Sequence, residues 1–208
     1  MSPPEKTALL IVDDDPLIRN SLSGILTEIG YRVRSAEDGF SALVEIRNEN
    51  PQILLSDLNM PGMSGFELLS VVRSRFPAIR VIAMSATFFG SDVPPGIIAD
   101  AFYEKGSSPR YLLQIVEVMA RSWETLASPQ RRPVLTPVWV PADGHQPPGE
   151  AYVMITCQEC LRTFPQVLSE LHGIIHQTSC VSCDSLVHYA IVPPISPASL
   201  TAFQLLPK

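Results

Sequence analysis

The chain has 208 residues, of which 46% are apolar, and it carries 15 Lys and Arg against 21 Asp and Glu, a formal net charge of −6. The length fits one large domain or two small ones. The acidic balance disfavours a broad nucleic-acid-binding surface, because phosphate binding depends on clustered cations. No apolar run approaches the ~18 residues that span a bilayer, and the first residues lack the pattern of an export signal, so we expect a cytoplasmic protein without membrane insertion.

Short apolar runs alternate with amphipathic stretches from about residue 7 to residue 123. Five of these runs predict strands, at residues 8–12, 31–34, 53–55, 81–84 and 101–104. Helical spacing of apolar residues, together with capping signals, predicts helices at 17–29, 40–46, 66–76, 91–100 and 108–123. This alternation indicates an α/β fold with a doubly wound, five-stranded parallel sheet. Ligands of such sheets bind at the carboxyl ends of the strands.

The pattern breaks after residue 124. Six prolines fall within residues 128–149, with no usable periodicity. We predict residues 125–149 to be a semi-extended linker that shares no core with either side, with a Pro-motif docking site as the alternative. The first domain is then expected at 6–124, a second at 150–190, and a Pro-rich tail at 191–208.

Acidic residues follow two of the predicted strands. Asp13, Asp14 and Asp15 come directly after the first strand, and Asp57 follows the third. Carboxylates that converge at one sheet edge repel one another unless a cation is held between them, and hard oxygen ligands suit Mg²⁺. The alternative is a solvated turn that caps the helix beginning at Pro16.

Two further residues favour a phosphoryl site at this edge. Ser85 follows the fourth strand and Lys105 follows the fifth. A hydroxyl donor, a fixed cation and a metal around one carboxylate together suit a phosphoryl group.

The same residues carry a resemblance to a known family. Over residues 6–124 the sequence resembles the receiver domain of two-component response regulators, whose fold is flavodoxin-like. The matching motifs lie at 11–16, 36–39, 57–65, 85–86 and Lys105, in the order and with the spacing of the family.

The resemblance implies a role for each matched residue. Asp57 would be the phospho-acceptor, with Ser85 and Lys105 as its catalytic partners and Phe102 as the aromatic switch residue. Mg²⁺ would be held by the carboxylates and by one backbone carbonyl, which are supplied by Asp13, Asp14, Asp57 and Asn59. A sensor histidine kinase would donate the phosphoryl group. Phosphorylation would then bias a surface formed by residues 91–123.

The sequence departs from the family in two places. Gly106 stands where the family usually has a Pro joined to the Lys through a cis peptide bond, so the geometry of this loop is open. Pro94 and Pro95 interrupt the helix expected at 91–100.

Cysteine spacing predicts a metal site in the second domain. Cys157, Cys160, Cys180 and Cys183 form C-x₂-C-x₁₉-C-x₂-C, a pattern typical of structural Zn²⁺ bound by four thiolates. Two disulfides are the alternative, which a cytoplasmic compartment disfavours. His172 and His176 are spaced i, i+4 and are candidates to replace a cysteine or to support one.

The second domain resembles a zinc ribbon in its spacing alone. Ribbon knuckles often have Gly after the second Cys, where this chain has Leu161 and Asp184. The segment is too small to fold on its own core, so we expect metal binding to supply much of its folding energy.

The predicted function follows from both domains. Residues 151–208 hold two basic residues against three acidic ones, and they lack the Lys/Arg stripe of a nucleic-acid-binding module. We therefore predict a response regulator, not an enzyme, that relays its signal to an unknown output protein through a small zinc-ribbon-like β module. The alternative is a transcriptional regulator whose ribbon contacts DNA. An enzymatic output is disfavoured, because residues 124–208 show no catalytic triad and no open metal site.

Overall fold

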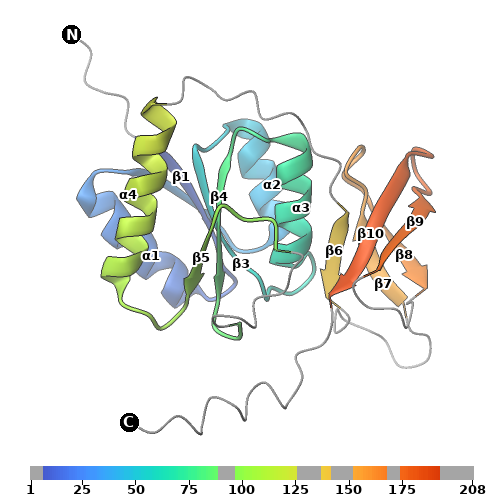
Figure 1. Cartoon of the computed structure of the whole chain (residues 1–208), viewed down its shortest axis with the longest axis horizontal. Helices are drawn as coiled ribbons and strands as arrows, with labels where there is room; N and C mark the ends of the chain where they lie inside the picture. The colour runs from blue at the N-terminus through green and yellow to red at the C-terminus, as the bar shows by residue number, and fades with distance from the viewer. Residues whose placement is uncertain (1–6, 89–96, 126–136, 142–151, 168–173, 193–208) are drawn as a thin grey trace, which may run out of the picture.

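A parallel five-stranded sheet forms the centre of the first part of the molecule (Figure 1). The structure is a computed structural model that describes residues 7–88, 97–125, 137–141, 152–167 and 174–192. The strands run in the order β2-β1-β3-β4-β5. They are β1 (Ala8–Val12), β2 (Arg32–Ala36), β3 (Ile53–Asp57), β4 (Arg80–Ser85) and β5 (Ala101–Glu104). The predicted doubly wound parallel sheet is confirmed.

Helices cover both faces of this sheet (Figure 1). They are α1 (Pro16–Ile29), α2 (Gly39–Asn48), α3 (Gly65–Arg75) and α4 (Pro109–Thr125). Alternate residues of the buried strands point to opposite faces. Leu10 and Leu54 therefore pack with α2 and α3, whereas Leu9 and Leu55 pack with α1 and α4. Most of the helix predicted at 91–100 lies outside the described residues, and residues 97–99 are not helical.

Local signals set the ends of the helices. Pro16 occupies the first turn of α1, and the Asp15 carboxylate accepts a hydrogen bond from Leu17 N–H at 2.8 Å, so the end of the acidic run is also a helix cap. The helix ends at Gly30, whose φ of 111° lies in the left-handed region. In α3 the Ser64 hydroxyl caps the first turn.

A second, all-β part follows, and we call it the C-terminal module. Its strands are β6 (Val138–Pro141), β7 (Tyr152–Thr156), β8 (Thr163–Val167), β9 (Ile175–Ser179) and β10 (Leu186–Val192). One sheet has the order β6-β10-β9, and β7 pairs with β8 in a second sheet. The two sheets share an apolar core that includes Val138, Ile155, Phe164, Tyr189 and Ile191.

Strand β6 corrects the linker prediction. Residues 138–141 were expected within the linker at 125–149, but they pair in parallel with Tyr189–Val192 of β10. Val138 and Val140 are buried in the core of the module. Pro141 does not prevent this pairing, because β6 is an edge strand and Pro is tolerated there. The end of β10 at Val192 also extends past the boundary expected at residue 190.

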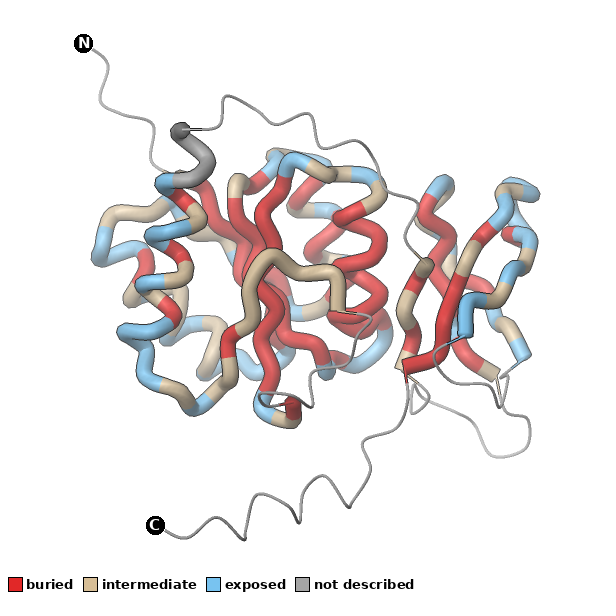
Figure 2. The backbone as a smooth tube through the Cα atoms, viewed as in Figure 1, coloured by how far each residue is buried: buried red, intermediate tan, exposed pale blue. Residues whose placement is uncertain are grey.

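The module packs against α3, so the expectation that the linker separates two independent cores is wrong. Every residue of α3 from Gly65 to Arg73 is buried (Figure 2). Val192 of the module belongs to the apolar cluster that α2 and α3 form with the five-stranded sheet, and Trp139 and Leu161 of the module pack against this cluster. Among the described residues, no helix is long and apolar enough to cross a membrane.

The buried carboxyl of Glu67 lies in this interface. Its Oε1 accepts a hydrogen bond from Thr156 N–H at 2.5 Å. Burial raises the pKa of Glu67 from 4.5 to about 7, and the hydrogen bonds from Thr156 offset only part of the shift. The folded state therefore binds more protons than the unfolded state between these two values, and stability falls as pH rises through that window.

Glu67→Gln is expected to remove this pH dependence, because the amide keeps the acceptor and carries no charge. The gain in the free energy of unfolding should reach about 3 kcal/mol above pH 7 and be small below pH 4.5. Urea unfolding across this pH range measures it, with the exposed Glu37→Gln as the control. A gain that is equal at all pH values would contradict the assignment.

Candidate functional site

Three carboxylates converge at the carboxyl edge of the sheet. Strands β1 and β3 are parallel neighbours, with Val12 opposite Ser56, so Asp13 and Asp14 follow β1 beside the end of β3, where Asp57 lies. One carboxylate oxygen from each of the three lies within 4.8 Å of the other two. Asp13 and Asp57 are buried, whereas Asp14 is exposed. This set of hard oxygen donors suits a divalent cation such as Mg²⁺.

Lys105 reaches the same point from the end of β5. Its Nζ lies 2.7 Å from Asp57 Oδ2 and 2.8 Å from Asp13 Oδ2. Burial lowers the pKa of Lys105, but hydrogen bonds and charge attraction to the two aspartates outweigh burial, so its pKa is raised overall. Burial raises the pKa of Asp57, and Lys105 opposes that rise. The ammonium is thus held charged beside the carboxylate.

Ser85 ends β4 at this edge and is fully buried. Its Oγ accepts hydrogen bonds from the backbone N–H groups of Thr87 at 3.0 Å and Phe88 at 3.2 Å. The Ser85 carbonyl accepts one from Lys105 N–H at 2.7 Å, which ties the two loops together. Phe102 lies in β5, half-buried against the apolar cluster below α3.

Other residues position this site. Asn59 donates from Nδ2 to Thr87 Oγ1 at 2.8 Å. Arg19 donates a hydrogen bond to the Asp13 carbonyl at 2.6 Å. The sequence analysis did not identify Arg19 as a site residue, because only its position in the first turn of α1 links it to the acidic run. Gly65 packs so closely that a Cβ there would lie 1.9 Å from the Asp57 carbonyl oxygen, so only Gly fits. Gly106 has φ of 99°, which Gly adopts without strain.

The model of the response regulator receiver domain family matches residues 9–116. The chain belongs to this family. Receiver domains are phosphorylated by sensor histidine kinases and bind Mg²⁺ at an acidic pocket, which here comprises Asp13, Asp14 and Asp57.

The chain is similar in sequence to several named regulatory proteins. The transcriptional activator protein ExaE of Pseudomonas putida is 33% identical over 117 residues, which cover 52% of each chain. The DNA-binding transcriptional regulator NtrC of Klebsiella pneumoniae is 38% identical over 97 residues, covering 47% of this chain and 19% of NtrC. The chain therefore spans only about half of ExaE and a fifth of NtrC.

Solved structures show the same fold. The chemotaxis protein CheY4 of Vibrio cholerae superposes with a TM-score of 0.52 at 28% identity, covering 55% of this chain and 99% of CheY4. A CheY-like receiver domain from Methanospirillum hungatei JF-1 gives a TM-score of 0.53 at 29% identity, covering 58% and 98%. The family match ends at residue 116, before the C-terminal module begins.

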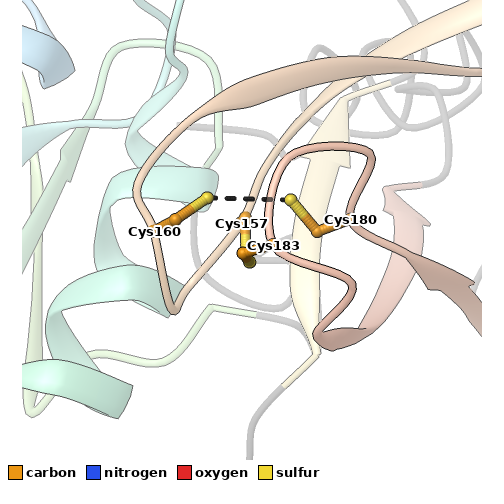
Figure 3. A group of neighbouring side chains, drawn as sticks. All are labelled: Cys157, Cys160, Cys180 and Cys183. Atoms are coloured by element: carbon orange, nitrogen blue, oxygen red, sulfur yellow. Dashed lines mark hydrogen bonds between the residues drawn. The ribbon is translucent and has the colours of Figure 1, made fainter.

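The four cysteines of the module form a second candidate site (Figure 3). Their Sγ atoms all lie within 4.8 Å of one another. Cys157 Sγ lies 3.7 Å from Cys183 Sγ, and Cys160 Sγ lies 3.7 Å from Cys180 Sγ. Tetrahedral Zn²⁺ with Zn–S bonds of ~2.3 Å separates its sulfurs by ~3.8 Å. The four side chains are free thiols, not disulfides, and their spacing fits a metal.

The thiols differ in acidity. Burial raises the pKa of Cys157 to about 12, whereas hydrogen bonds with the side chain and backbone of Ser185 lower the pKa of Cys183 to about 6. A bound metal favours the thiolate form of its cysteine ligands.

The two Cys-x₂-Cys turns have the same backbone. Leu161 N–H donates to the Cys157 carbonyl, and Asp184 N–H donates to the Cys180 carbonyl, both at 2.9 Å. Leu161 and Asp184 have φ of 59° and 57°. Both positions therefore adopt the left-handed conformation without the Gly that usually provides it.

His172 and His176 were candidates to join or support the cysteine site. The ring of His176 stacks on Tyr189 with centroids 5.3 Å apart, and the cluster found among the described residues contains only the four cysteines. His172 lies outside the described residues.

Asp184→Gly is expected to stabilise the module by about 0.5–1 kcal/mol, because Gly adopts the left-handed region without strain. Ser182→Gly, in the same turn but without a positive φ, is the matched control and should give no gain. Thermal unfolding of the full chain with Zn²⁺ added measures both, and an equal response of the two variants would refute the prediction.

Proposed function

We propose that the chain accepts a phosphoryl group on Asp57 from a histidine kinase and relays the signal through a zinc-binding C-terminal module. The observation that carries the proposal is the placement of Asp57, with the Lys105 ammonium 2.7 Å from its carboxylate and two further aspartates beside it. The role is that of a phospho-acceptor, with no catalysis beyond phosphotransfer and autodephosphorylation.

The proposed reaction uses this arrangement directly. An Asp57 carboxylate oxygen attacks the phosphorus of the phosphohistidine, and the P–N bond breaks with its electron pair returning to the ring nitrogen. The other ring nitrogen already carries a proton, so the histidine leaves as a neutral imidazole. Lys105 neutralises charge on the equatorial oxygens, so catalysis is positioning plus electrostatics. Asp13, Asp14 and the carbonyl of Asn59 would hold Mg²⁺, which adds positive charge at the same oxygens when bound.

The switch is proposed to follow the same edge. The phosphoryl group adds about −1.5 to −2 charge and acceptor oxygens beside Asp57. In the unphosphorylated chain the Ser85 hydroxyl accepts hydrogen bonds from the N–H groups of Thr87 and Phe88. After phosphorylation it would give up these bonds and donate a hydrogen bond to the phosphoryl group. Phe102 then turns into the space that this movement opens.

Asp14→Ala is expected to weaken Mg²⁺ binding, because the substitution removes a direct ligand. Glu37→Ala, which removes an exposed carboxylate outside the cluster, is the control and should bind Mg²⁺ as the unaltered chain does. Titration followed by NMR measures both. An unchanged Mg²⁺ affinity in Asp14→Ala would exclude this residue as a ligand.

The module is proposed to bind structural Zn²⁺ through its four cysteines and to contact an output protein. Arg162 is offset by the exposed acidic residues Glu159 and Asp184, which favours a protein partner over DNA. The alternative, a DNA-binding ribbon, is supported by the names of relatives such as ExaE and NtrC.

Amide hydrogen exchange with acetyl phosphate and Mg²⁺ tests the relay. Exchange within residues 152–167 is expected to change in the unaltered chain and to stay constant in Asp57→Asn. Identical exchange with and without phosphorylation would contradict a relay to the module. Salt-sensitive binding of duplex DNA by the module would favour the alternative.

A further inference from the structure

The turn between Cys157 and Leu161, which we call the first knuckle, lies directly on α3. Gln158 donates from Nε2 to the Ser70 carbonyl at 3.4 Å. The Glu159 carboxylate lies 2.9 Å from Nη1 of Arg75. Consecutive residues inside the metal-binding turn therefore contact the receiver part.

Flanking residues extend this contact along the same helix. Thr156, which precedes the first cysteine, donates its N–H to Glu67. Trp139 of β6 donates its N–H to Ser70 Oγ at 3.3 Å, and Leu161 packs against the apolar cluster beneath α3. The surface of α3 that faces the module is thus defined by Glu67, Ser70 and Arg75.

Two backbone hydrogen bonds and one left-handed residue define the conformation of the knuckle. Cys157 N–H donates to the Arg162 carbonyl and Leu161 N–H to the Cys157 carbonyl, which closes the turn. The left-handed backbone conformation of Leu161 is unfavourable for a non-glycine residue, so other interactions of the turn must offset its free-energy cost. Four thiolates on one metal would supply that energy, and metal binding would then order the residues that contact α3.

The other end of α3 is tied to the phosphorylation site. The loop from Leu58 to Ser64 leads from Asp57 into the helix, and Gly65 N–H donates to the Leu58 carbonyl at 3.0 Å. Asn59 and Met60 of this loop and Val153 and Met154 of the module line a common cavity of about 800 Å³. The loop therefore borders the module across this cavity.

We propose that the first knuckle is a metal-dependent docking surface for α3, so that zinc binding by the module and its docking on the receiver stabilise each other. The inference rests on the proposed function, because it takes Zn²⁺ to fill the four-cysteine site. Coupling between two sites is reciprocal. Zinc removal should then increase hydrogen exchange in α3. Substitutions on the α3 surface should in turn lower the zinc affinity of the module.

Zinc affinity of full-length variants, measured by chelator competition, tests the proposal. Ser70→Ala leaves Trp139 N–H without its acceptor, and Arg75→Glu places like charges beside Glu159. Both are expected to lower zinc affinity by roughly fivefold or more. The charge-swapped double variant Arg75→Glu with Glu159→Arg is expected to recover most of the affinity lost in Arg75→Glu.

A matched control lies on the opposite side of the receiver. Arg121 and Glu117 form an exposed pair on α4, and Arg121→Glu should leave zinc affinity unchanged. Hydrogen exchange of residues 66–75 gives a second measurement, and it should rise when zinc is removed from the unaltered chain.

The outcomes separate the two proposals. A chain that binds no zinc overturns the zinc site and this coupling together. A chain that binds one zinc with the same affinity in Ser70→Ala, Arg75→Glu and the unaltered protein overturns the coupling alone. An Arg121→Glu variant that loses zinc as Arg75→Glu does would also overturn it, because the effect would then be general.

Discussion

Asp57→Asn is expected to abolish phosphoryl uptake from acetyl phosphate in the presence of Mg²⁺, while the fold persists. The amide has nearly the shape of the carboxylate but is a poor nucleophile, so the P–O bond cannot form. Lys105 keeps its second partner, Asp13, at 2.8 Å, and the partly buried ammonium therefore stays paired. Radiolabelled acetyl phosphate measures uptake, and circular dichroism checks the fold.

Asp15→Asn is the matched control for this experiment. Asp15 belongs to the same acidic run but caps α1 through Leu17 N–H, and Asn caps helices about as well as Asp. This variant should take up label at the rate of the unaltered chain. Label retained on Asp57→Asn, or lost equally from Asp15→Asn, would disprove Asp57 as the acceptor.

Zinc removal is expected to unfold the C-terminal module and leave the five-stranded sheet intact. Metal binding contributes on the order of 10 kcal/mol or more to the folding free energy of structural zinc sites. The small apolar core around Phe164 and Tyr189 cannot supply that much stability on its own. Amide NMR dispersion of the full chain follows both parts during chelation.

Metal analysis of single variants identifies the ligands. One zinc is expected for each chain, and Cys180→Ser should reduce it sharply, because Ser is a poor zinc ligand. Ser182→Ala in the same turn is the control and should keep the metal, as should His172→Ala and His176→Ala. Loss of zinc in His172→Ala alone would replace the four-cysteine site by one that contains histidine.

The acidic site was predictable because its parts are fixed by the ends of parallel strands. Once 8–12 and 53–55 are taken as neighbouring strands, Asp13 and Asp57 must meet, and the same holds for Ser85 and Lys105. The cysteine cluster was predictable from spacing, since two Cys-x₂-Cys turns have few ways to meet.

The interface between the two parts was not predictable in the same way. Strand β6 has four residues among prolines and pairs with β10 some fifty positions later, and neither local pattern nor periodicity marks it. In α3 the residues that contact the module include the polar Glu67 and Ser70. A polar face on a helix normally predicts contact with solvent, so the sequence of α3 did not indicate that a second domain covers this side.

The order of strands in the module has a consequence for biosynthesis. Strand β10 is the central strand of its sheet and pairs with both β6 and β9, so that sheet cannot close before residue 192 has left the ribosome. All five strands of the receiver sheet precede residue 105, and parts of a chain that emerge first fold first. The receiver therefore forms ahead of the module, and its finished α3 can serve as the template on which the nascent β strands assemble.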